Sequence, residues 1–183
     1  MRLFLIRHGH ALADPDDARR PLSAHGSETT RRVAAFLRTS GALAAVQAVW
    51  HSPLVRARQT AELLLQDLGP DARLIETAGL RPGDDPGAVA ERLDRMDRVV
   101  MIVGHEPQLT ALATLLVCGR RKPVAFALKK SAVLALEQTG ERHKKSGRDR
   151  WSVCWQLLPE LLASGGEEEA AARSGIGRRR GAT

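Results

Sequence analysis

A short apolar segment near the start of the chain leads directly into an arginine, a histidine and a glycine. Residues 3–6 are all apolar, without polar alternation, which predicts a strand buried on both faces as in a parallel sheet. Arg7 and His8 therefore fall at the carboxyl end of that strand, where open α/β folds place their ligands. Gly9 allows the backbone to turn sharply or to approach a ligand closely. This order of residues predicts a site for chemistry on an anion.

The remainder of the chain alternates segments typical of strands with segments typical of helices. Strands are expected at about 46–50, 74–75, 99–103, 132–136 and 152–157. Helices are expected from Ser23 or Ser27 to Gly41, from Pro53 to Gly69 with Ser52 as the N-cap, over 89–96, and after Pro107 through Leu116. This alternation predicts an α/β fold, a three-layer α/β/α sandwich around a mostly parallel central sheet.

The length of 183 residues suits one domain with a sizeable core. We expect this domain to span residues 1–164, and the Gly-, Ala- and charge-rich residues 165–183 to be disordered. Cys118 and Cys154 lie far apart in apolar segments, which predicts reduced core thiols in a cytoplasmic protein. No apolar run approaches the roughly 18 residues of a membrane span, so no membrane association is expected.

The formal net charge of +7 favours anionic partners without identifying them. Part of this charge lies in basic clusters at 120–122, 129–130, 142–150 and 178–180. Aromatic residues make up only 3% of the chain, too few to interleave with these clusters. No nucleic-acid-binding module is recognisable either, so nucleic acid is not expected as a partner.

Three predicted strands end in an arginine or a histidine. Arg7 and His8 follow the first strand, Arg56 follows the strand at 46–50, and His105 follows the strand at 99–103. Because the carboxyl ends of parallel strands lie along one edge, we expect these side chains to meet there. Arg20, held extended by the proline after it, adds a third guanidinium. Arginine forks match the paired oxygens of phosphate, so a phosphoryl group is the predicted ligand.

Several motifs resemble those of the histidine phosphatase superfamily, and specifically its small SixA-type phosphohistidine phosphatases with the phosphoglycerate mutase-like fold. The motifs are Leu-Ile-Arg-His-Gly at 5–9, Arg-Pro-Leu-Ser at 20–23, Ser-Pro-Leu-Val-Arg-Ala-Arg-Gln-Thr-Ala at 52–61 and Val-Gly-His-Glu-Pro at 103–107. Leu-Arg-Pro-Gly at 80–83 and Leu-Lys-Lys-Ser at 128–131 also fit that branch. The resemblance covers roughly residues 1–158 in order.

The resemblance implies a phosphatase that needs neither a metal nor a cofactor. His8 would attack phosphorus and become a transient phosphohistidine, which water then hydrolyses to inorganic phosphate. Arg7, Arg56 and His105 would hold the phosphoryl oxygens, and Arg20 would be a further clamp. The implied substrate is a phosphohistidine-bearing protein, either a phosphotransfer domain of a signal-transduction relay or a phosphotransferase-system protein. Cationic neighbours would keep the imidazole of His8 neutral and nucleophilic.

The proton donor for the leaving group is less clearly marked in the sequence. Other members of the superfamily use a dedicated acidic residue, whereas the corresponding loop here offers only Asp84 and Asp85, in shifted positions. Glu106 beside His105, and His10, are the other candidates. Because imidazole leaves more easily than an alkoxide, the absence of a firm acid favours a phosphoramidate substrate.

Three alternatives remain open at this point. One keeps the fold but makes the chain a phosphomonoesterase or mutase of a small phosphorylated metabolite. Another is a metallohydrolase that uses His8, His10 and His105 as ligands. The third is a non-catalytic protein that binds phosphorylated or nucleic-acid partners through its basic surface.

Overall fold

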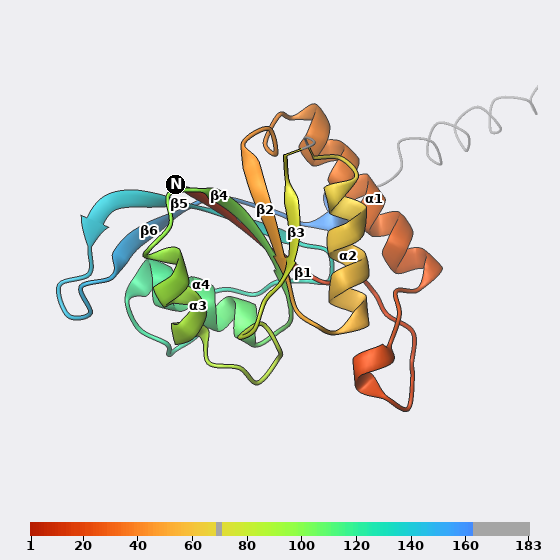
Figure 1. Ribbon diagram of the computed structural model, residues 1–183, viewed down its shortest axis with the longest axis horizontal. Coiled ribbons are helices and arrows are strands. Elements are labelled where there is room, and N and C mark those ends of the chain that lie inside the picture. The colour runs from red at the N-terminus through yellow and green to blue at the C-terminus, as the bar shows by residue number, and fades with distance from the viewer. Residues whose placement is uncertain (69–70, 163–183) are drawn as a thin grey trace, which may run out of the picture.

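Six strands form one sheet in the computed structural model, which describes residues 1–68 and 71–162 (Figure 1). The strand order is β3-β2-β4-β1-β5-β6. β1 to β4 run parallel to one another, and β5 and β6 are antiparallel additions beside β1. The strands are β1 (Arg2–Arg7), β2 (Val46–His51), β3 (Arg73–Glu76), β4 (Val99–Gly104), β5 (Val133–Arg142) and β6 (Asp149–Leu157).

Helices cover both faces of the sheet (Figure 1). Alternate residues of β1 point to opposite sides, so Leu3 and Leu5 pack in one core cluster and Phe4 and Ile6 in another. The first cluster includes side chains of α3 (Pro86–Leu93) and α4 (Gln108–Cys118), and the second includes those of α1 (Ala24–Thr39) and α2 (Val55–Leu65). The predicted three-layer α/β/α architecture is therefore confirmed.

The amino end of α1 packs so closely against the segment after β1 that only glycine fits at one contact. The Ser23 hydroxyl caps α1 by accepting from the Gly26 amide at 3.0 Å, as predicted from the sequence. A Cβ on Gly26 would lie 2.1 Å from the His10 carbonyl oxygen, so only glycine fits at this contact. The amino end of α1 is thus pressed against the segment that follows His8.

Several boundaries differ from the sequence-based prediction. The second helix begins at Val55, not Pro53, and Ser52 does not cap it. The side chain of Ser52 is instead fully buried against His105. This helix ends at Leu65, and Gly69 lies outside the described residues.

The third helix lies three residues earlier than predicted, because Asp85 caps it and Pro86 occupies its first turn. β5 and β6 are longer than predicted, since their outer halves form a largely exposed polar ribbon without the apolar pattern of a core strand. The expectation of core thiols is wrong: Cys118 and Cys154 are both exposed.

The predictions for the end of the chain, with a boundary at 164 and a disordered segment at 165–183, lie outside the described residues. Within the described part of the chain, no helix combines the length and hydropathy needed to cross a bilayer.

Candidate active site

Three of the predicted site residues meet at the carboxyl edge of the parallel strands. His8 follows β1 and His105 follows β4, and their ring centroids lie 4.8 Å apart. Arg56, in the first turn of α2, places its Nε 3.3 Å from the Nε2 of His8. All three are almost completely buried, with 7%, 1% and 4% of His8, His105 and Arg56 exposed. The pairing of Arg7 in β1 with Gly104 in β4 brings the two histidines level with each other.

The hydrogen bonds of His8 define which ring nitrogen is free to react. Nδ1 lies 2.7 Å from the carbonyl oxygen of Gly9, and a carbonyl only accepts, so Nδ1 carries the proton. Nε2 therefore holds the lone pair and accepts from Arg56. The Gly9 amide in turn donates to the Thr60 hydroxyl at 3.1 Å, which fixes the turn after the strand. A Cβ on Gly9 would come within 2.9 Å of the Thr30 hydroxyl, so glycine allows this close packing.

Burial and positive charge keep both histidines neutral. Burial lowers the pKa of His8 to about 4, and the charges of Arg56, Arg7 and Lys130 contribute in the same direction. Burial likewise lowers the pKa of His105 to about 3, with smaller contributions from His8 and Arg56. An unprotonated imidazole is the nucleophilic form, and the ring of His8 is in this form at neutral pH.

Arg7 and His105 are two further predicted phosphate ligands, and each side chain is held by its own contact. Arg7 donates from Nη1 to the Leu128 carbonyl at 2.9 Å, which holds its guanidinium beside the site. The Nε2 of His105 lies 2.9 Å from the Ser52 hydroxyl, and its Nδ1 is buried without a partner among the described residues. Ser52 thus positions His105, a role that its place at the start of a predicted helix did not indicate.

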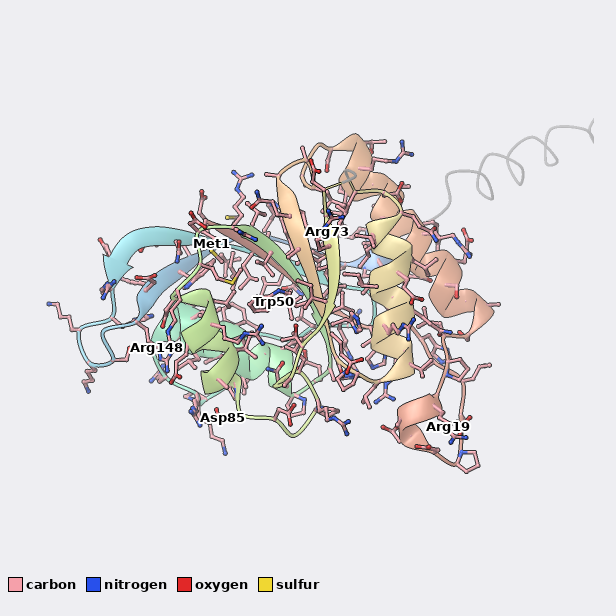
Figure 2. The ribbon with its side chains drawn as sticks, viewed as in Figure 1. Met1, Arg19, Trp50, Arg73, Asp85 and Arg148 are labelled. Carbon is pink, nitrogen blue, oxygen red and sulfur yellow. The ribbon has the colours of Figure 1, made fainter. Side chains whose placement is uncertain are left out.

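Asp17 is a site residue that the sequence analysis did not single out. It begins a short 3-10 helix, η1 (Asp17–Arg19), which projects from the body of the molecule, as the position of Arg19 in Figure 2 shows. Its carbonyl accepts from the Nη1 of Arg56 at 2.7 Å, and its carboxylate accepts from Nη2 at 3.1 Å. Only its place among neighbouring acidic residues, in a loop before an arginine, marks it in the sequence.

Arg20 reaches the site only through Asp17. Its Nη1 donates to the Asp17 carboxylate at 3.1 Å, and its Nε donates to the Leu12 carbonyl at 3.0 Å. The hydrogen bond from Arg20 is the main reason that the pKa of Asp17 is lowered, and Arg56 contributes further. Two of the predicted phosphate ligands are therefore joined by one ionised carboxylate.

The three candidate proton donors have different surroundings. His10 is exposed, with Nδ1 hydrogen-bonded to the Ser23 hydroxyl at 2.8 Å. The Asp84 carboxylate accepts from the Arg81 amide at 2.8 Å. Glu106 accepts a hydrogen bond from Thr110, and burial raises its pKa, as a general acid requires.

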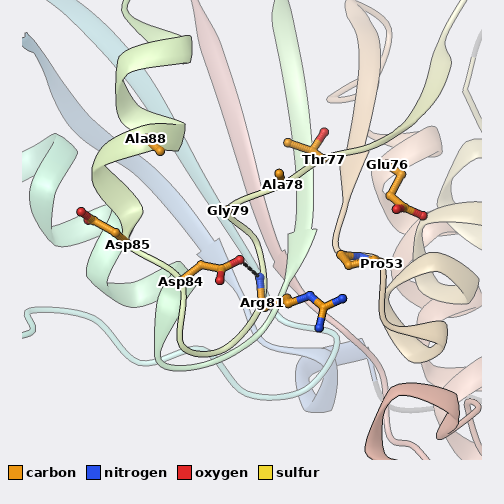
Figure 3. Close-up of a pocket in the computed structure, with 9 residues that line it drawn as sticks. All are labelled: Pro53, Glu76, Thr77, Ala78, Gly79, Arg81, Asp84, Asp85 and Ala88. Atoms are coloured by element: carbon orange, nitrogen blue, oxygen red, sulfur yellow. Dashed lines mark hydrogen bonds between the residues drawn. The ribbon is translucent and has the colours of Figure 1, made fainter.

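A cavity of about 720 Å³ lies beyond the ends of β2 and β3 (Figure 3). Pro53 in its wall directly follows Ser52, the partner of His105. Three carboxylates line it, those of Glu76, Asp84 and Asp85, together with the guanidinium of Arg81.

Within the described ranges, no group of three or more His, Cys, Asp or Glu side chains is arranged to hold a metal ion. The metallohydrolase alternative requires His10 beside His8 and His105, whereas His10 is bonded to Ser23. The residues present therefore do not fit that alternative.

Comparisons with known proteins identify the family of the chain. Residues 3–84 match the model of the histidine phosphatase superfamily (branch 1). An uncharacterized protein of Picosynechococcus sp. is 34% identical over 150 residues, which cover 78% of this chain and 88% of that protein. An uncharacterized protein of Mycobacterium tuberculosis is 38% identical over 117 residues, covering 61% and 69% of the two chains. The chain belongs to the histidine phosphatase superfamily.

Solved structures show the same fold. The protein histidine phosphatase SixA, complexed with tungstate, superposes with a TM-score of 0.74 and 28% identity, over 88% of this chain and 99% of that one. Phosphoserine phosphatase from Entamoeba histolytica, in complex with 3-phosphoglyceric acid, gives a TM-score of 0.57 at 15% identity, over 88% and 98% of the two chains. The second likeness concerns the fold alone.

The lowered pKa values of the two histidines predict a loss of stability in mild acid. The unfolded chain takes up protons on these rings near the ordinary pKa of 6.5, whereas the folded protein takes them up only near 4 and 3. The free energy of unfolding should therefore fall as the pH decreases from about 6.5 towards 4. Urea unfolding at several pH values measures this slope.

His105→Asn removes one of the two titrating rings, so its slope over the same range should be shallower than that of the unsubstituted protein. His143→Asn is the matched control, because His143 lies outside the site, where it contacts the Leu116 carbonyl. Equal slopes for the two variants would contradict the lowered pKa of His105.

Proposed function

We propose that this protein is a phosphohistidine phosphatase that acts on phosphorylated proteins through a covalent intermediate on His8. The observation that carries the proposal is the buried, neutral ring of His8, whose Nδ1 is bonded to Gly9 and whose Nε2 faces Arg56. The similarity to SixA over nearly the whole of that chain supports it.

In the first step, the Nε2 lone pair of His8 forms a bond to phosphorus as the bond from phosphorus to the substrate nitrogen breaks. The electron pair of the broken bond goes to the departing imidazole, which takes up a proton. In this proposal Arg7, Arg56 and the unpartnered Nδ1 of His105 stabilise charge on the phosphoryl oxygens. Of the three candidate donors, Glu106 is the one whose pKa is raised by burial, so we assign it the role of the acid.

In the second step, water attacks the phosphorus and the bond to Nε2 breaks. The electron pair returns to the ring of His8, the water gives up a proton to a nearby base, and inorganic phosphate is released. Glu106, once it has given its proton to the leaving group, is the matching base. The enzyme returns to its starting state.

A metabolite phosphatase or mutase of the same superfamily is the second candidate. The cavity of about 720 Å³ beside Ser52 favours it, because a small phosphorylated ligand could be enclosed there. Its acidic wall of Glu76, Asp84 and Asp85 disfavours it, since most such metabolites carry further negative charge.

The substrate class is tested by comparing two phosphate donors. A peptide with a chemically phosphorylated histidine should give a kcat/KM at least roughly tenfold higher than phosphoglycerate, because imidazole is the better leaving group. His8→Ala should lower phosphate release by about a thousandfold or more. Faster release from phosphoglycerate, or an active His8→Ala variant, would contradict the proposal.

Arg58→Ala is the matched control for these measurements. Arg58 lies in the same helix as Arg56 but forms an exposed ion pair with Glu62 at 2.8 Å. Its loss should leave kcat/KM within about twofold, since such exposed pairs contribute little.

The position of Asp17 predicts that it competes with the phosphoryl group. On the guanidinium of Arg56, Nε faces His8 and Nη2 faces the Asp17 carboxylate. A phosphoryl group on His8 would use this same edge for a two-pronged contact. Asp17→Asn should therefore lower the inhibition constant of inorganic phosphate by about two- to tenfold.

Asp16→Asn removes the same charge from an exposed pair with Arg19 and serves as the control. Phosphate inhibition of both variants shows whether Asp17 competes with the phosphoryl group for Arg56 or orients Arg56 towards that group. Weaker phosphate binding in Asp17→Asn alone would show that this carboxylate orients Arg56 rather than competing with the ligand.

A further inference from the structure

A second cavity, of about 500 Å³, is lined by Arg7 and by other basic side chains. We call it the basic cavity. Cationic side chains reach it from three parts of the chain: α1, the segment before β5 and β1. The residues that the argument uses are Arg7, His25, Thr29, Arg32, Lys129 and Lys130. We propose that this cavity holds a carboxylate-rich segment of the phosphoprotein substrate; the inference rests on the function proposed above.

The cavity shares one residue, Arg7, with the candidate active site. Arg7 lines its wall and also stands beside His8, where its charge lowers the pKa of that ring. Lys130, another wall residue, acts on His8 in the same way. A polypeptide that presents a phosphohistidine to His8 would therefore place neighbouring residues against this wall.

Unpaired hydrogen-bond donors gather at the cavity. The Nε atoms of Arg7 and Arg32 and the hydroxyl of Thr29 are buried without a partner among the described residues. Leaving such groups unpaired costs about 1–3 kcal/mol each, so native proteins rarely do it without a reason. Small rotations of these side chains would turn the donors towards an oxygen-rich ligand.

The charge of the wall is mostly uncompensated. Lys129 is paired with Glu160, the one carboxylate that lines the cavity. Within residues 1–68 and 71–162, none of the ion pairs involves Arg7, Arg32 or Lys130. A concave surface with several unpaired cations attracts negatively charged groups over a distance.

The size and spread of the wall favour a polypeptide over a small anion. A single carboxylate is comparable to a few water molecules, each of about 30 Å³, and would leave most of the cavity unfilled. The cations are also distributed over separate segments of the chain, so several acidic side chains can each find a partner. An acidic stretch beside the phosphohistidine fits this arrangement.

Two peptides of equal length test the proposal. Both carry a chemically phosphorylated histidine, flanked in one by Asp and Glu and in the other by Ser and Asn. We expect kcat/KM to be roughly tenfold higher for the acidic peptide, mainly through a lower KM. The preference should shrink at high salt, because the contacts are electrostatic and partly exposed.

Arg32→Gln should reduce the ratio of acidic to neutral turnover by roughly three- to tenfold. Arg31→Gln is the matched control: Arg31 is the exposed neighbour in α1, does not line the cavity, and its loss should leave the ratio unchanged. Equal turnover of the two peptides, or the same ratio in Arg32→Gln as in the unsubstituted protein, overturns the inference while the proposed function stands.

Other outcomes distinguish a failure of the proposed function from a failure of the proposed occupant of the cavity. Release of phosphate from neither peptide would overturn the proposed function itself. Faster turnover of phosphoglycerate than of both peptides, reduced by Arg32→Gln, would show that the cavity serves a small metabolite, and the polypeptide occupant would be wrong.

Discussion

The hydrogen bond from the Nδ1 of His8 to the Gly9 carbonyl, 2.7 Å long, is the interaction on which the site depends. It places the ring proton on Nδ1 and leaves the lone pair on Nε2, facing Arg56. Burial then keeps the ring uncharged, with a pKa of about 4. The Thr60 hydroxyl, which accepts from the Gly9 amide, and the close packing of α1 against Gly9 hold this segment in place.

The same site has to hold several cationic side chains close together. The structure does this by leaving both imidazoles neutral, so that only the guanidiniums are charged. Asp17 supplies a carboxylate between Arg56 and Arg20, which lessens their mutual repulsion. Arg7 has no such partner among the described residues and lies between the reaction centre and the basic cavity. The charges of Arg56 and Arg20 are thus partly balanced by Asp17, whereas the charge of Arg7 has no carboxylate partner among the described residues.

Sequence reasoning succeeded where apolar pattern and topology determine position. His8 and His105 each follow an uninterrupted apolar strand, and parallel pairing of β1 with β4 leaves little freedom in where they meet. Sequence reasoning failed where the role of a residue depends on contacts with side chains from distant segments of the chain. Ser52 had the pattern of a helix cap but is bonded to His105, 53 residues away in sequence. Loop conformations, which the hydrophobic pattern does not predict, determine the contact of Asp17 with Arg56, the position of Arg20 and the shape of the basic cavity.

The most direct test of the account is to trap the phosphorylated enzyme and locate the phosphoryl group. Rapid quenching under alkaline conditions preserves phosphohistidine, mass spectrometry identifies the residue, and phosphorus NMR distinguishes the two ring nitrogens. The account predicts a phosphoryl group on Nε2 of His8. A phosphoryl group on Nδ1 of that ring, or on His105, would contradict it.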